Sequence, residues 1–174
     1  MSVDAFLDLF EKWNRSINLS AASTRAELRE HFDDSLHVVP LLANAKRVLD
    51  VGSGGGFPVV VAAMSLPAVS FVSLEPVHKK HAFLRTAARE LGLSNLQACA
   101  ERLDDHPAHD YDAATSRATF DLKEWLERGL ERVIPGGLVL GFEAVPRADL
   151  GEVDRVEYEI AGKRRAIVIA RKAP

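Results

Sequence analysis

The 174-residue chain is poor in the features that mark several classes of protein. Its single cysteine, Cys99, excludes an internal disulfide and favours a reducing cytoplasm. No apolar run approaches the roughly 20 residues that a membrane helix needs. The first residues, M-S-V-D-A-F, also lack the basic and apolar regions of a secretory signal. We therefore expect a cytoplasmic protein that does not span a membrane.

The chain also lacks an excess of positive charge, since 22 Lys and Arg stand against 25 Asp and Glu. Broad nucleic-acid binding depends on neutralising phosphates, so a net charge of −3 argues against it. The charge is unevenly distributed, because residues 76–102 carry five Lys or Arg against two acids, whereas residues 103–161 contain fourteen acids. A small basic patch is therefore compatible with residues 76–102.

What the chain does have is one dense glycine stretch. Val48, Leu49 and Val51 predict a buried strand, and Gly52, Gly54 and Gly56 follow it with Gly55 between them. In the dinucleotide fingerprint G-x-G-x-x-G the third glycine would fall at Phe57, so the spacing does not favour NAD. The pattern D-x-G-x-G-x-G instead resembles the first motif of the class I S-adenosylmethionine (SAM) methyltransferases, in which this turn holds the methionine part of the cofactor.

Strands and helices alternate through the rest of the chain. Apolar residues from Val3 to Ile17 recur at helical spacing, and Thr24 with Glu27 forms a capping box for a second helix that runs toward Pro40. Helices are predicted at 58–64, from Pro76 to Leu91 and at 122–133, and strands at 69–74, 96–100, 112–116, 138–142, 153–160 and 164–170.

This alternation predicts an α/β fold with a mostly parallel sheet, helices on both of its faces and ligands at the carboxyl ends of its strands. The last two strands predict an antiparallel hairpin, which is typical of the class I SAM methyltransferase variant of this Rossmann-like sheet. We expect one domain over residues 1–174, with residues 1–45 as a short N-terminal helical extension and residues 46–174 as the SAM-binding sheet domain.

Several acids stand where such a sheet meets a nucleoside. Glu75 ends the second strand, where a carboxylate accepts hydrogen bonds from ribose hydroxyls or stabilises the dipole of the Pro76 helix. Asp50 precedes the glycine turn and is either a turn-capping acid or a group facing the sulfonium side of SAM. After the third strand, Leu103 and Asp104 are candidates for contact with adenine, although a solvated acidic loop explains Asp104 equally.

Four motifs in one order carry a narrower resemblance: H-F-D-D-S-L at 31–36, D-V-G-S-G-G-G-F-P at 50–58, K-K-H-A-F-L at 79–84 and S-R-A at 116–118. Together with W-N-x-x-x-N-L-S at 13–20, they resemble the bacterial methyltransferases of small-subunit ribosomal RNA that make 7-methylguanosine, historically called glucose-inhibited division protein B. The resemblance implies SAM as cofactor, the 30S particle or its precursor as partner, and methyl transfer to guanine N7.

The resemblance also implies roles for individual residues. Arg117 of the S-R-A motif is the candidate catalytic residue, which orients cofactor or guanine, and its alternative is a salt bridge at the pocket rim. Lys79 and Lys80 match a basic pair that would contact RNA phosphates, and their alternative is a solvated helix face. His31, Asp34 and Ser35 share a helix face, where they either line the pocket mouth and bind substrate or attach the N-terminal helices to the sheet. Phe57 is expected to contact the cofactor, together with the residues of the glycine turn.

The chain departs from the family pattern at several positions. Val59 replaces a glycine, Glu75 replaces an aspartate, and Glu143 stands near a family lysine, which reverses a charge on the substrate side. The helix that should follow is missing or is reduced to residues 146–152. A second hypothesis is therefore a diverged SAM-binding protein that acts on another substrate or has no catalytic activity. We expect no metal site, because the remaining histidines lack matching ligands, and we expect a monomer.

Overall fold

Within the described residues, 2–22 and 24–174, the computed structural model forms a seven-stranded sheet in the order β3-β2-β1-β4-β5-β7-β6. The first five strands run parallel, and β7 pairs antiparallel with both β5 and β6. The strands are β1 (Arg47–Val51), β2 (Ser70–Leu74), β3 (Leu96–Cys99), β4 (Tyr111–Ser116), β5 (Val133–Glu143), β6 (Asp154–Ile160) and β7 (Lys163–Arg171). This sheet, parallel except for its C-terminal hairpin, confirms the predicted fold class.

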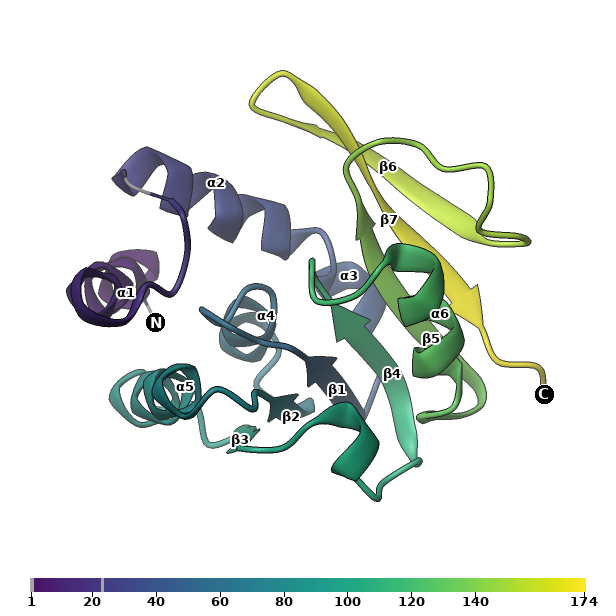
Figure 1. The fold of residues 1–174 in the computed structure, drawn as a ribbon, viewed down its shortest axis with the longest axis horizontal. Helices are drawn as coiled ribbons and strands as arrows, with labels where there is room; N and C mark the ends of the chain where they lie inside the picture. Colours follow the sequence, from purple (N-terminus) through teal and green to yellow (C-terminus); the bar gives the residue numbers. More distant parts are fainter. Residues whose placement is uncertain (1, 23) are drawn as a thin grey trace.

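Helices cover both faces of the sheet (Figure 1). They are α1 (Val3–Ile17), α2 (Arg25–Leu36), α3 (Val39–Leu42), α4 (Val59–Ser65), α5 (His78–Glu90) and α6 (Leu122–Leu130), with a 3₁₀ turn, η1, at Leu103–Asp105. Neighbouring residues of a strand point into two different hydrophobic cores. Val48 packs in the core formed with α1, α2, α4 and α5, and Leu49 packs in the core formed with α6. The period-2 alternation of buried strands therefore gives two cores.

The N-terminal helices are held by a few specific contacts. Phe6 of α1 packs edge-on against Phe10 and against Phe57, which follows the glycine turn, and the Phe10 ring is tilted against that of Phe57. At the start of α2, Thr24 accepts from the backbone N–H of Glu27 and the Glu27 carboxylate accepts from Thr24 N–H, as the capping box predicted. Residues Met1 and Ser23 lie outside the described residues, and the separation of residues 1–45 as an extension stays a prediction.

Two predicted boundaries were wrong. Helix α5 begins at His78 and not at Pro76, because Val77 is extended and its N–H donates to the Glu75 carboxylate. Helix α6 ends at Leu130 and not at residue 133, and β5 already pairs at Val133 with β4, before the predicted strand start at residue 138. Residues 146–152 contain no helix, so of the two alternatives the helix is missing.

The C-terminal hairpin turns at Ala161 and Gly162, whose φ angles of 49° and 72° are both positive. Such a pair matches the type I′ turn that suits the twist of two antiparallel strands, so Lys163 lies in β7 and not in the turn. Among residues 2–22 and 24–174, no helix is long and apolar enough to cross a bilayer.

Candidate active site

The glycine turn leaves β1 and is fixed by backbone hydrogen bonds, from Gly52 N–H to Leu74 O at 2.9 Å and from Gly56 N–H to Ser53 O at 2.7 Å. All three alternate glycines have positive φ. A Cβ at Gly52 would lie 2.0 Å from Thr119 Oγ1, and one at Gly56 would lie 2.5 Å from Val60 Cγ2. A Cβ at Gly54 would meet nothing closer than 3.8 Å. Gly54 therefore faces open space, whereas Gly52 and Gly56 are needed for packing.

That open space is a cavity of about 480 Å³, which we call the turn pocket. Glu75, only 4% exposed, lies in its wall and accepts from Gly54 N–H at 2.8 Å and from Val77 N–H at 2.9 Å. A carboxylate has about four acceptor positions, so these two bonds leave room for hydroxyl donors. The remaining lining residues are Leu19, Ser20, Gly52, Ser53, Gly55, Phe57, Pro76, Lys80, Arg117, Ala118 and Thr119.

Asp50 lies beneath this turn and is fully buried. Its carboxylate accepts from the hydroxyls of Ser53 and Thr115, the latter at 2.6 Å. Burial raises the pKa of Asp50 from 3.8 to about 6, although both hydroxyls favour the ionised form. This geometry favours the turn-capping alternative over an approach to the cofactor.

A second cavity of about 210 Å³, the strand-end pocket, adjoins the turn pocket at Gly52, Pro76 and Thr119. Leu103 is buried in its wall, and its contact with adenine stays a prediction. Asp104 lies at the rim with 76% of its side chain exposed, and Arg128 donates to it. The Asp104 carboxylate is thus both solvated and ion-paired.

Arg117 stands where the turn pocket meets a third cavity. This cavity, of about 300 Å³, we call the aromatic pocket; it is lined by His31, Asp34, Ser116, Arg117, Ala118, Phe120, Leu122, Trp125, Phe142, Glu143, Ala144, Tyr158 and Arg165. The Arg117 guanidinium lies 5.4 Å from the Phe57 ring centre and 5.9 Å from that of Phe142. Its side chain is 19% exposed, and burial lowers its pKa. Arg117 therefore forms a wall between two cavities and not a rim.

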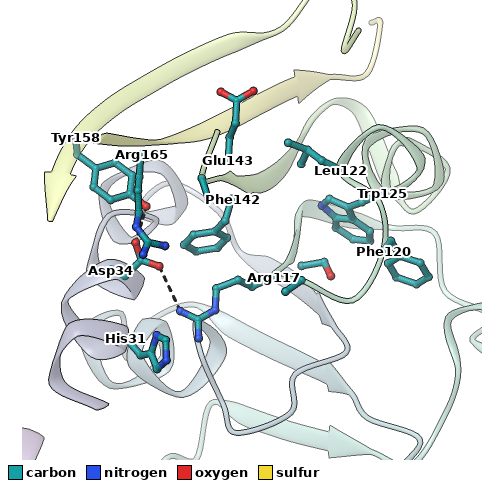
Figure 2. A pocket seen from close by; sticks show the side chains of 13 residues that line it. His31, Asp34, Arg117, Phe120, Leu122, Trp125, Phe142, Glu143, Tyr158 and Arg165 are labelled. Carbon is teal, nitrogen blue, oxygen red and sulfur yellow. Dashed lines mark hydrogen bonds and ion pairs between the residues drawn. The ribbon is translucent and has the colours of Figure 1, made fainter. Parts of the chain in front are cut away.

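Asp34 joins three distant segments at this point. It is buried, and its two oxygens accept from Arg117 Nη1 at 3.3 Å and from the Tyr158 hydroxyl at 2.7 Å (Figure 2). His31 lies one helical turn away, and its pKa is lowered by burial and by Arg117, so its ring is neutral at pH 7. Both residues line the aromatic pocket, and Asp34 also attaches α2 to the hairpin.

Ser35 does not belong to this group. Its side chain is fully buried and donates to the backbone carbonyl of His31 at 2.7 Å. The helix face that carries His31 and Asp34 ends before Ser35 reaches the cavity. This geometry favours a structural role for Ser35, because a serine hydroxyl within a helix readily bonds the carbonyl four residues earlier.

Lys79 and Lys80 occupy the first turn of α5, at the positive end of the helix dipole. Lys79 is exposed, and Lys80 is half-buried and lines the turn pocket. Cations at a helix N-terminus repel its dipole, so an anion bound beside them would relieve that repulsion. The alternative interpretation, in which these lysines only form a solvated helix face, therefore suits Lys79 better than Lys80.

Glu143 does not present its charge to the substrate side. Its carboxylate accepts from Arg155 Nε at 2.9 Å and from Arg147 N–H at 2.9 Å. In Figure 2 it points away from Arg117, toward the hairpin. These contacts lower the pKa of Glu143, so its carboxylate stays ionised, and the positive charge of Arg155 compensates its negative charge. The predicted reversal of charge in the cavity is therefore offset by a partner twelve residues later in the chain.

Several residues of the two larger cavities were not predicted as site residues. Leu19 and Ser20 belong to the W-N-x-x-x-N-L-S segment, in which Asn14 Oδ1 accepts from Ser20 N–H at 3.0 Å. That motif was the available signal for them. Tyr158 and Arg165 have no such signal, because their place depends on how the hairpin folds back over α2. Among the described residues, no three His, Cys, Asp or Glu are placed to hold a metal.

Comparison with known proteins identifies the family. The family model described as "GidB: rRNA small subunit methyltransferase G" matches residues 1–170. Ribosomal RNA small subunit methyltransferase G of Neisseria gonorrhoeae is 34% identical over 97% of this chain and 86% of its own length. The Laribacter hongkongensis protein of the same name is 42% identical over 76% of this chain, which spans only 64% of that relative.

A solved structure adds evidence on the fold alone. The O-methyltransferase TomG of Streptomyces achromogenes, solved with SAM, superposes with a TM-score of 0.68 over 99% of this chain and 92% of its own, at 17% identity. The sheet is therefore that of the class I SAM methyltransferases. With the family model over residues 1–170, these findings confirm the resemblance read from the four motifs: the chain belongs to the rRNA small subunit methyltransferase G family.

Proposed function

We propose that the protein transfers a methyl group from SAM to N7 of a guanine in small-subunit ribosomal RNA. The observation that carries this proposal is the meeting of the turn pocket and the aromatic pocket at Arg117 and Ala118. One cavity has the backbone and the carboxylate that suit a nucleoside cofactor, and the other has the aromatic walls that suit a base. Methyl transfer needs two such sites side by side.

The residues fit the cofactor. The turn pocket offers Gly54 as a surface without a side chain and Glu75 as an acceptor for ribose hydroxyls. The adjoining strand-end pocket offers Leu103 to the face of an adenine and Asp104 to its amine. SAM bound there supplies an electrophilic methyl group on a sulfonium. The chain's own residues then have to hold donor and acceptor in line.

Guanine N7 carries a lone pair and no proton, so its methylation requires no strong general base. Two centres held in line at about 3–3.5 Å gain most of what such a site can supply. Arg117, fixed by Asp34 and placed between the cavities, is suited to orient the acceptor. Removing Arg117 should therefore impair the positioning of the guanine, and an added base should not restore the rate, because the reaction involves no proton transfer.

The proposed RNA contact uses the start of α5, where Lys79 and Lys80 lie beside the turn pocket and offer charge to phosphates. The base has to leave its stack to reach the aromatic pocket. We further propose that the protein acts as a monomer in the cytoplasm, on the 30S particle or its precursor. A diverged enzyme with another substrate is less well supported, because Arg155 neutralises Glu143.

Mass mapping of small-subunit ribosomal RNA from a strain that lacks the gene tests the function. We expect one 7-methylguanosine to disappear and to return when the gene is restored. If every 7-methylguanosine persists unchanged in that RNA, the proposed reaction is wrong. Mapping also identifies the nucleotide that is modified.

Calorimetric titration with SAM tests the cofactor site. An arginine at Gly54 should fill the turn pocket and abolish binding. Gly92→Arg is the matched control, because Gly92 also has positive φ, 62°, and its Cβ would meet nothing within 4 Å. Equal SAM affinity in the two variants would remove the turn pocket from the cofactor site.

A further inference from the structure

The aromatic pocket has an uneven set of charged groups. Its acids are Asp34 and Glu143, and its cations are Arg117 and Arg165. Both oxygens of Asp34 already accept hydrogen bonds, and Glu143 is turned toward Arg155. The charged groups left to meet a ligand are thus guanidinium groups, which only donate hydrogen bonds.

Of the two arginines, Arg165 gives the stronger evidence for a bound ligand. Its Nη2 lies 3.4 Å from Glu30, but its buried Nε has no hydrogen-bond partner anywhere in the described part of the chain. A buried donor without a partner is destabilising, and few such groups occur in native proteins. Figure 2 shows the Arg165 side chain reaching from β7 toward Asp34, beside Phe142. An acceptor atom on a bound ligand would satisfy this Nε.

A purine offers N7 to the methyl donor whether it is guanine or adenine. The two differ beside N7, where guanine carries the acceptor O6 and adenine carries the donor N6 amine. A guanidinium that donates to O6 leaves N7 free for attack and leaves an adenine amine facing another donor. The charged groups of this cavity therefore distinguish the two bases at the 6-position.

We propose that the aromatic pocket is the acceptor-base site and that Arg165, together with Arg117, selects guanine by donating to O6. This inference rests on the proposed function and specifies the substrate of the same site. Phe142 and Trp125 provide apolar surface for the base. Arg165 also lines a neighbouring cavity beside the hairpin, which shares Glu143, Ala144 and Tyr158 with the aromatic pocket. The nucleotide can therefore enter from that side.

Tyr158 is a positioning residue in this arrangement. Its hydroxyl donates to Asp34 at 2.7 Å, and its ring stacks on His37 at 3.8 Å between ring centres. Tyr158 thus fixes the carboxylate that fixes Arg117. Loss of its hydroxyl should release the Arg117 guanidinium while an aromatic ring stays in the wall of the pocket.

Base analogues at the mapped nucleotide test the proposal. Small-subunit RNA is prepared by ligation with guanosine, inosine or 2-aminopurine at that position, and methyl transfer from SAM is measured with wild-type protein and Arg165→Gln. Inosine keeps O6 and N7, whereas 2-aminopurine keeps N7 and has no oxygen at the 6-position. Arg171→Gln, in the exposed end of β7, is the matched control.

For wild type we expect inosine to react within about fivefold of guanosine and 2-aminopurine to react at least tenfold more slowly, since a donor to O6 is worth about one to two decades. Because intrinsic N7 reactivity cancels between enzymes, the ratio of guanosine to 2-aminopurine rates should fall at least fivefold in Arg165→Gln and stay constant in Arg171→Gln. Tyr158→Phe should lower kcat with guanosine while SAM affinity is unchanged.

The inference is overturned if 2-aminopurine reacts as well as guanosine, or if Arg165→Gln and Arg171→Gln give the same ratio as wild type. A thermal melt and a SAM titration on each variant separate loss of folding from loss of recognition. If wild-type protein transfers no methyl group to guanosine in this RNA, the proposed function fails instead. The two failures are thus distinguishable.

Discussion

The pH dependence of stability is set in part by Asp50, the acid beneath the glycine turn. Its pKa is raised by burial from 3.8 to about 6. The unfolded chain therefore loses this proton at lower pH than the folded protein does, so folding stability falls as pH rises from about 4 to about 6 and is level above that. At about 1.4 kcal/mol per pKa unit, the difference amounts to about 3 kcal/mol.

The variant Asp50→Asn keeps the shape and removes the titration. We expect the free energy of unfolding of wild type, measured in urea relative to that of the variant, to decrease by about 3 kcal/mol between pH 4 and pH 7. Parallel profiles for the two proteins would refute the reasoning. Carboxyl ¹³C shifts give the midpoint directly, and Thr115→Val should move it to higher pH because one donor to the ionised form is lost.

Three further predictions concern packing and charge. Gly55→Ala places a Cβ 2.4 Å from Phe10 Cε2, so urea unfolding should show a loss of about 1–3 kcal/mol that is partly recovered in a Phe10→Leu background. Glu143→Lys, toward the family residue, places a second cation beside Arg155 and removes the acceptor of its Nε, so urea unfolding should show a lower free energy of unfolding; unchanged stability would contradict the charge compensation described above. Phe57→Ala should cost about 3–5 kcal/mol and weaken SAM binding, whereas Phe57→Leu should retain most of both.

Local sequence patterns were sufficient to predict the glycine turn and its carboxylate neighbour Glu75. Gly54 and Glu75 lie next to each other because a strand that ends in an acid and a strand that ends in a glycine turn are parallel neighbours, and β1 pairs with β2. That relation follows from the alternation of strands and helices. The α2 capping box was likewise predictable, since its two partners are three residues apart.

The partners on the other side are far apart in the chain, and no local pattern could pair them. Tyr158 lies 124 residues after Asp34, and only the folding of the hairpin over α2 brings them together. Glu143 was judged by its charge alone, whereas its effect in the structure depends on Arg155. Ser35 was assigned by helical spacing, which gives the face of a helix but not where the cavity ends.

This difference follows a division of labour within the fold. Most residues that line the turn and strand-end pockets lie in the strands and turns between residues 47 and 104, and structures at 17–19% identity share that sheet. The aromatic pocket instead takes Asp34 from α2, Arg117 from the S-R-A segment and Tyr158 from β6. Because a cavity assembled from distant segments of the chain can change without disturbing the central sheet, an acid such as Glu143 at the end of β5 is accommodated there by its ion pair with Arg155 of β6.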